Sequence, residues 1–211
     1  MKRALILLAL AAAAYVPAAA AQVQPFVAAG ITIPAGSIAE VDEALPFGDA
    51  GLGLQVDGGI ALGMQRGAVD VRIFGTYATA SRDFDDFNRE IAQNGIDLRL
   101  DGDVRVVGAG VGAAYYFPTE LLTDVFPYVL ASGGVYQQRH TIDYTGDDVA
   151  PGTESDVETE TRVGAAGGVG LVWAPGRVRI FLESRLQALM SAGERPGYLI
   201  PVQLGVKFGR P

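Results

Sequence analysis

The chain contains no cysteine, and His140 is its single histidine. Without cysteine it can form neither a disulfide framework nor a thiolate metal site, and no lipid can be attached through a cysteine. Basic residues are also scarce, since 16 Lys and Arg face 24 Asp and Glu and the net charge is −8. Nucleic-acid binding requires clustered Lys and Arg side chains that neutralise phosphates. This sequence contains no such basic stripe, so we expect no nucleic-acid partner. No catalytic metal cluster is visible, and we expect no cofactor.

Long apolar runs are confined to the first 21 residues. These begin with the basic Met1-Lys2-Arg3, continue through an apolar stretch and end in the small residues Ala19 and Ala21. The pattern predicts a signal peptide over residues 1–21, followed by one domain over residues 22–211. Loss of Lys2 and Arg3 would change the charge from −8 to −8 − 2 = −10. The alternative is a membrane anchor, but the run is shorter than the ~20 residues of a span.

Beyond residue 21 no apolar stretch of membrane-helix length remains, yet the composition is strongly apolar. The chain has 49% hydrophobic residues, 28 glycines and a mean hydropathy of +0.25. Residues 178–190 alternate, with the apolar Ile180, Leu182 and Leu186 on one face and Glu183 and Arg185 on the other. An alternating strand of this length is near the roughly 9–11 residues that cross a bilayer in a barrel. The pattern indicates a transmembrane β-barrel.

The fold class expected is all-β, an antiparallel up-and-down transmembrane β-barrel of about eight strands. The predicted strands are residues 23–33, 51–62, 68–80, 103–117, 126–138, 161–174, 178–190 and 198–209. The connections alternate in length, with long ones at residues 34–50, 81–102 and 139–160. Bacterial outer-membrane barrels show this asymmetry, with tight periplasmic turns and long outer loops. Both chain ends would then lie on the periplasmic side. Helical periodicity is weak, and its best candidate is the loop piece 87–91.

A soluble barrel of the lipocalin type is the main alternative fold, since its strands also alternate. Such a barrel would place its apolar face inward and cover its outer face with charge. The sixth predicted strand argues against it, because its two faces, which begin with Val163 and Arg162, both lack enough charge to meet water. A surface with so few charged residues is expected only where it contacts lipid or a protein partner.

Charged residues on the less apolar faces are expected to occupy the barrel interior. This predicted lumen charge network comprises Asp70, Arg72, Arg105, Arg162, Arg179, Glu183, Arg185 and Lys207. Buried charge is tolerated when it is paired, and both signs are present. One hypothesis is an internal plug of salt bridges that stabilises the barrel, and the other is a hydrated path that conducts small solutes.

Aromatic residues cluster near the predicted strand ends, which is typical of the girdles at membrane interfaces. They are Tyr77, Tyr115, Tyr116, Phe117, Phe126, Tyr128, Tyr136, Trp173, Tyr198 and Phe208. Ordinary strand propensity favours the same residues and is the alternative explanation.

The closing segment 198–208 resembles the last strand of outer-membrane β-barrel proteins, and the Pro-Tyr and glycine pattern of residues 127–135 is similar to their central strand. The resemblance is to the small OmpA-like and opacity-type barrels of the porin family. It implies a Gram-negative cell envelope, location in the outer membrane, and insertion by the barrel-assembly machinery. Phe208 would be the aromatic anchor of the closing strand, although the chain continues through residues 209–211.

Enzymatic chemistry is not expected. Some small outer-membrane barrels are lipid A deacylases with a serine, a histidine and a carboxylate, but no serine stands two residues after His140. The outer loops are acidic, and we expect them to be solvated at a surface where lipopolysaccharide is a partner. A specific calcium site in these loops is the alternative, although their spacing matches no EF-hand. The function favoured is an outer-membrane barrel with a structural or surface-interaction role, and an extracellular ligand of its loops is expected as a partner. The alternatives are a minor pore, a lipid A-modifying hydrolase and a soluble carrier.

Overall fold

The computed structural model describes residues 21–38, 50–64, 68–82, 84–118, 124–146, 155–175, 178–191 and 195–208. Residues 1–20 of the predicted signal peptide, and residues 209–211 after the closing strand, lie outside the described residues. In the part of the chain that is described, no helix has both the length and the apolar character that a membrane span requires.

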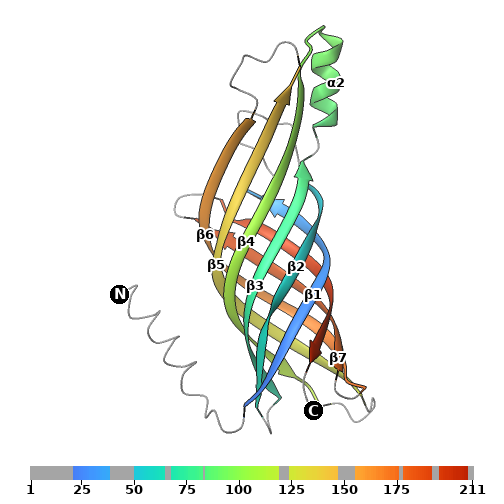
Figure 1. Ribbon diagram of the computed structural model, residues 1–211, viewed down its shortest axis with the longest axis vertical. Coiled ribbons are helices and arrows are strands. Elements are labelled where there is room, and N and C mark those ends of the chain that lie inside the picture. Colours follow the sequence, from blue (N-terminus) through green and yellow to red (C-terminus); the bar gives the residue numbers. More distant parts are fainter. Residues whose placement is uncertain are drawn as a thin grey trace, which may run out of the picture.

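Eight antiparallel strands in chain order close into one barrel (Figure 1). The strands are β1 (Ala21–Gly36), β2 (Ala50–Met64), β3 (Val69–Arg82), β4 (Arg99–Tyr116), β5 (Val125–Thr145), β6 (Ser155–Trp173), β7 (Val178–Met190) and β8 (Gly197–Phe208). Each strand pairs with its sequence neighbours, and β1 pairs with β8 from Phe26↔Lys207 to Gly36↔Gly197. The fold class expected from the alternation is confirmed.

The outer wall of the barrel is apolar, and the polar side chains point inward. On β7, Leu182 and Leu186 are 50% and 54% exposed, whereas Glu183 and Arg185 are 4% and 6% exposed. The same parity holds along β1, where Val23, Val27 and Ile31 are exposed. A continuous apolar outer surface around a closed barrel is the surface that hydrocarbon solvates, and a polar interior is the opposite of the lipocalin arrangement. The soluble-barrel alternative is therefore wrong.

Six of the eight strands are longer than the sequence predicted, and β5 exceeds its predicted length by the most. The outer loop expected over residues 139–160 is largely strand, because β5 continues to Thr145 and β6 begins at Ser155, with register Asp143↔Ser155. Residues 140–145 and 155–161 alternate polar with β-branched or aromatic residues, which favour a strand even without burial. The weak helical candidate at residues 87–91 belongs to helix α2 (Asp85–Gln93), and the Asn88 side chain bonds the backbone of Leu100 on β4.

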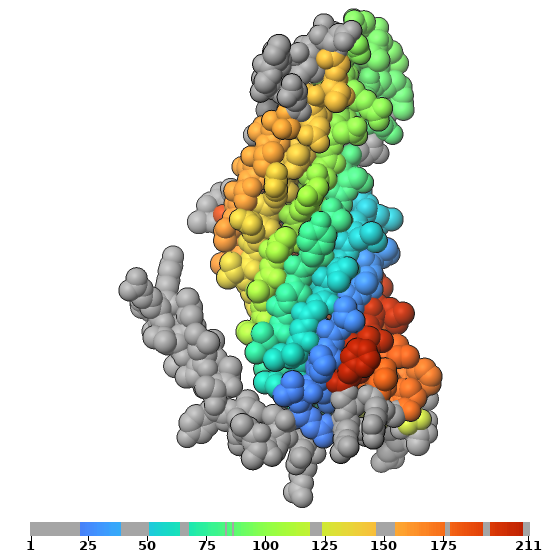
Figure 2. Space-filling view, viewed as in Figure 1, coloured from blue at the N-terminus to red at the C-terminus, as the bar shows by residue number. Residues whose placement is uncertain are grey.

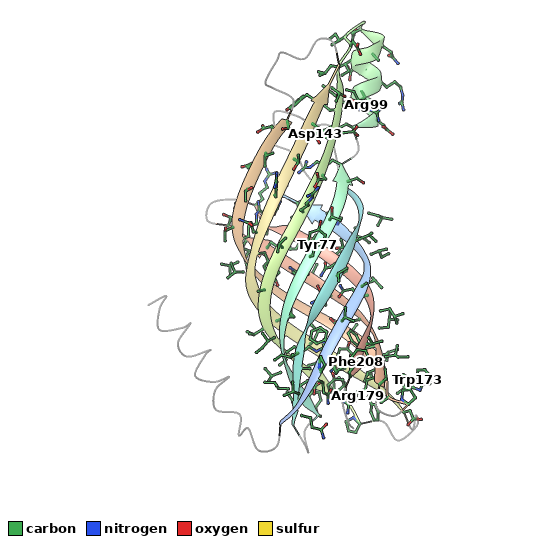
Figure 3. All side chains as sticks on the ribbon, viewed as in Figure 1. Tyr77, Arg99, Asp143, Trp173, Arg179 and Phe208 are labelled. Atoms are coloured by element: carbon green, nitrogen blue, oxygen red, sulfur yellow. The ribbon has the colours of Figure 1, made fainter. Side chains whose placement is uncertain are left out.

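The long strands β4, β5 and β6 form an extension that rises beyond the rest of the barrel and carries α2 at its far end (Figures 1 and 2). β6 pairs with β7 only from Val163 to Trp173, whereas its pairing with β5 continues to Ser155. Arg99 and Asp143 lie toward this end, and Trp173 and Phe208 lie at the opposite end (Figure 3). Short connections join strands at the end where β1 begins and β8 ends, which makes it the periplasmic end and makes the extension extracellular.

Candidate functional site: the barrel interior

The interior of the barrel is narrow, as eight strands require, and small residues on β4 and β6 make room for large rings. Gly170 lies against the Tyr128 ring and Gly108 against the Tyr136 ring, and a Cβ at either glycine would overlap the ring. These contacts explain the small-residue face of the sixth predicted strand. The two tyrosines are almost fully buried and fill the lumen from β5.

The layer nearest the periplasmic end joins β3 to the far wall of the barrel. Arg72 Nη1 lies 2.6 Å from Glu183 Oε2, and Tyr128 Oη donates to the same oxygen at 2.7 Å. Lys207 Nζ lies 2.5 Å from Asp70 Oδ2. Since β1 and β2 separate β3 from β8, these ion pairs cross the lumen rather than run along its wall.

Aromatic rings and a tyrosine hydroxyl complete this layer. Tyr116 Oη donates to Asp70 Oδ2 at 2.8 Å and accepts from Lys207 Nζ at 2.8 Å. The Arg72 guanidinium lies 5.2 Å from the centre of the Tyr128 ring and 5.7 Å from that of Phe181. Ring faces attract a desolvated cation, so the aromatic residues stabilise the charge that the barrel buries.

A second layer lies at mid-barrel and is centred on Arg185. This guanidinium forms an ion pair with Asp57 of β2 and donates to Gln203 Oε1 at 2.8 Å. Its Nε lies 3.3 Å from Glu183 Oε1, which links the two layers. Gln55 and Thr76 also donate to Asp57, so this carboxylate accepts from three strands.

A cavity of about 20 Å³ lies between the two layers, bordered by Asp57, Arg72 and Glu183 among others. That is room for about one water molecule. The described residues thus fill the middle of the lumen, and the cavity is far smaller than a path for a hydrated solute.

The extracellular end of the interior holds a third polar group. Arg162 pairs with Glu160 at 2.6 Å and donates to Ser37 Oγ at 2.7 Å. His140 faces inward on β5, where its Nδ1 contacts Arg82 Nη2 and its Nε2 contacts the Gln138 amide. Since a guanidinium only donates, Nδ1 accepts and the imidazole is neutral. Burial, with Arg82 and Arg162 nearby, lowers the pKa of His140 to about 4.

The isolated histidine allows a direct test of this electrostatic environment. We expect the His140 imidazole to titrate near pH 4 and to be neutral at pH 7. In Arg82→Gln the titration should move up toward 6.5, because one repelling cation is lost, but burial should keep it below that value. NMR of ring-labelled histidine in micelles measures both. Arg99→Gln, far up the extension, is the control and should leave the midpoint unchanged. A wild-type midpoint near 6.5 would contradict the structure.

The structure places seven of the eight predicted network residues on the inner face of the barrel. Asp70, Arg72, Glu183, Arg185 and Lys207 join in the two membrane layers, Arg162 lies in the extracellular group and Arg179 is half-buried near the periplasmic end. The predicted interior position of Arg105 is wrong, because the residue lies on the outer face. Its side chain there is 51% exposed and pairs with Asp103 at 2.7 Å. It lies on the extracellular side of the apolar belt, the band of outward apolar residues that includes Val107, Ala109 and Val111 on β4, and there a charge faces outward at little cost.

The aromatic residues divide between the two faces. Tyr77, Tyr115, Phe117, Trp173 and Phe208 are exposed on the outer wall as the girdle hypothesis expects. The predicted girdle positions of Tyr116, Phe126, Tyr128 and Tyr136 are wrong, because these rings point into the lumen. Phe208 lies outward at the end of β8, opposite Val178, and its role as an anchor stays a prediction.

Sequence reasoning missed several interior polar partners, among them Asp57, Tyr116 and Tyr128. Asp57 shares its strand face with Gln55, so the alternation of residues 51–62 already indicated that Asp57 lies on the polar, inward face. Tyr116 and Tyr128 were assigned to the interface instead of the network. Within the described residues, no group of three or more His, Cys, Asp and Glu could hold a metal ion.

Comparison with solved structures supports the architecture. The chain is similar to Neisserial surface protein A, with 15% identity, coverage of 89% of this chain and 96% of that protein, and a TM-score of 0.51. It is also similar to a major outer membrane protein from Thermus thermophilus, with 12% identity, coverage of 90% and 98%, and a TM-score of 0.54. No family model matches the sequence, and no curated protein matches it. These similarities show the fold, which is that of small outer-membrane β-barrels.

Proposed function

We propose that this chain is a non-conducting outer-membrane β-barrel with a structural or surface-interaction role. The observation that carries the proposal is the double layer of ion pairs across the lumen, with about 20 Å³ of space between the layers. A barrel filled in this way has no route for solutes through its middle. Its accessible surfaces are the outer wall and the extracellular extension.

The extension supports a role at the cell surface. Above the apolar belt, β4 and β5 present alternating acids and bases outward, including Asp101, Asp103, Arg139 and Asp143. Helix α2 adds further polar surface at the far end (Figure 3). An extracellular ligand of this extension belongs to the proposal, as does contact of the outer wall with lipopolysaccharide.

Insertion by the barrel-assembly machinery is proposed from the closing strand. β8 ends in the outward Phe208 and alternates Val202, Leu204 and Val206 outward with Gln203 and Lys207 inward. We propose no catalytic role. His140 contacts Arg82 and Gln138 and stands near Glu160, and this arrangement serves the polar packing of the extracellular end.

Planar-bilayer recording tests the closed lumen. We expect no discrete conductance steps from the purified wild-type protein after insertion has been verified by heat-dependent migration on SDS gels. A general porin in the same bilayer provides the positive control. Reproducible steps from the folded chain would overturn the proposal and favour the minor pore, because a lumen packed to this density cannot pass hydrated ions.

A further inference from the structure

Two arginines stand side by side on the outer face of the extension. Arg105 of β4 and Arg139 of β5 are direct register partners, and both side chains point outward. Residues directly opposite in antiparallel strands have Cβ atoms about 4.5–5.5 Å apart, and like charges at such positions are destabilising. In a chain of net charge −8 with acidic outer loops, this pair is an exception that needs a counter-charge.

The described residues supply only part of that counter-charge. Arg105 Nε lies 2.7 Å from Asp103 Oδ2. Arg139 is exposed and makes no ion pair or hydrogen bond in the described part of the chain. One carboxylate therefore faces two guanidinium groups, and a positive charge remains on the surface.

The neighbours of the pair in the sheet are hydroxyl groups that also face outward. Thr79 of β3 is the register partner of Arg105, and Thr159 of β6 is the register partner of Arg139. The outer face thus presents four adjacent hydrogen-bond donors in the order Thr79, Arg105, Arg139 and Thr159, which we name the cationic row. The planar guanidinium group of arginine binds two phosphate oxygens with two parallel N–H donors, and the threonine hydroxyls can donate further hydrogen bonds to the same phosphate.

The height of the cationic row relative to lipid follows from the rows beneath it. The next outward row toward the periplasmic end is two residues away on each strand and is mixed in character: Tyr77, Val107, Gln137 and Thr161. The row after that is wholly apolar: Gly75, Ala109, Val135 and Val163. Two residues span about 6.6 Å along a strand, and less along the membrane normal because barrel strands tilt. The headgroup region is about 5–8 Å thick on each side of the hydrocarbon. The pair is four residues above the last wholly apolar row, about 9–11 Å along the membrane normal, and therefore stands at the outer limit of the headgroup region on the wall that lipid surrounds.

We propose that Arg105 and Arg139, flanked by Thr79 and Thr159, bind the phosphate group of an outer-leaflet lipid. The proposal rests on the proposed function and names a partner for the outer wall. A phosphate between the two guanidinium groups relieves their repulsion and accepts from both. The position on the lipid-facing wall, one mixed row above the wholly apolar row, favours a lipid over a free anion, because a lipid phosphate is held near this depth by its acyl chains.

The test measures retention of lipid A by the folded full chain in micelles of a phosphate-free maltoside detergent. Wild type should retain bisphosphoryl lipid A, and the double variant Arg105→Gln, Arg139→Gln should bind it about tenfold or more weakly, as expected for lost charge-assisted hydrogen bonds. Arg99→Gln is the matched control, since Arg99 faces outward on the same strand further from the belt. It should bind as wild type does.

Two further arms separate the sources of phosphate. Dephosphorylated lipid A should bind wild type as weakly as bisphosphoryl lipid A binds the double variant, and millimolar inorganic phosphate should leave lipid A retention unchanged. Equal retention by wild type and the double variant, or equal binding of dephosphorylated lipid A, would overturn the proposal. Displacement by inorganic phosphate would assign the site to a free anion and overturn the lipid assignment. Heat-dependent migration verifies each folded barrel first, so failure here is distinct from failure of the proposed function.

Discussion

Replacing Glu183 with glutamine is expected to lower the free energy of unfolding by about 3–5 kcal/mol, which is the cost of removing one charged partner of a buried ion pair. The Glu183 carboxylate accepts from Arg72 and Tyr128 through one oxygen and lies 3.3 Å from Arg185 through the other. A glutamine amide of the same shape would turn an NH2 group toward one of the two guanidinium groups. Arg72 would then lose its ion pair, whereas Arg185 would keep the ion pair with Asp57.

Urea unfolding in detergent or lipid, followed by migration on SDS gels, measures this loss. Glu158→Gln is the matched control, because Glu158 is exposed on the extension and has no ion pair or hydrogen bond among the described residues. We expect it to change stability by no more than about 0.5 kcal/mol. Equal effects of the two substitutions would show that the lumen layers contribute nothing to folding.

A second variant shows whether the loss arises from unpaired charge. Adding Arg72→Met to Glu183→Gln removes one of the two cations at this carboxylate position, so the double variant should be more stable than the sum of the single effects predicts. Coupling energies of neighbouring buried charges are about 0.5–3 kcal/mol. Strict additivity would contradict the interaction across the lumen.

Leu182→Arg is expected to destabilise the inserted barrel by about 2–4 kcal/mol, whereas Val157→Arg should have little effect. Both wild-type side chains are apolar and point outward, with exposed fractions of 50% and 44%. They differ in height, because Leu182 lies within the apolar belt on β7 and Val157 lies on the β6 extension. An arginine at the first position enters hydrocarbon, and at the second it enters water.

The comparison uses urea unfolding of both variants in phospholipid vesicles. In a protein whose outer wall faced water throughout, the two substitutions would be equally mild, because the original exposures are alike. Similar small losses at both positions would therefore contradict the membrane assignment, and a large loss at Leu182 alone would support it.

Alternation predicted the strands of this chain well wherever one face is apolar and the other polar. The bounds expected for β7, residues 178–190, agree with the structure. The limits of β5 and β6 were missed because polar residues beyond the belt were assigned to loops. In the structure these segments pair with each other and alternate between two solvent-facing sides.

Arg105 shows why parity alone is insufficient. It shares a face with Val107, Ala109 and Val111, which point outward, yet the prediction placed it in the interior with the seven other residues of the lumen charge network. Parity decides which side a residue faces, and height along the strand decides what lies on that side. The partners of Arg72 and Arg185 were equally beyond prediction, because contacts across the lumen depend on how the closed barrel juxtaposes β2 and β3 with β7.

The central claim is that the apolar outer wall contacts lipid, and Trp173 reports on it directly because it is the only tryptophan. Its side chain is 48% exposed on the outer wall near the periplasmic end. In vesicles of brominated phospholipids we predict strong quenching of its fluorescence, greatest for bromines near the headgroups, and weak quenching by aqueous acrylamide. Efficient quenching by acrylamide with no effect of any brominated lipid would contradict the account.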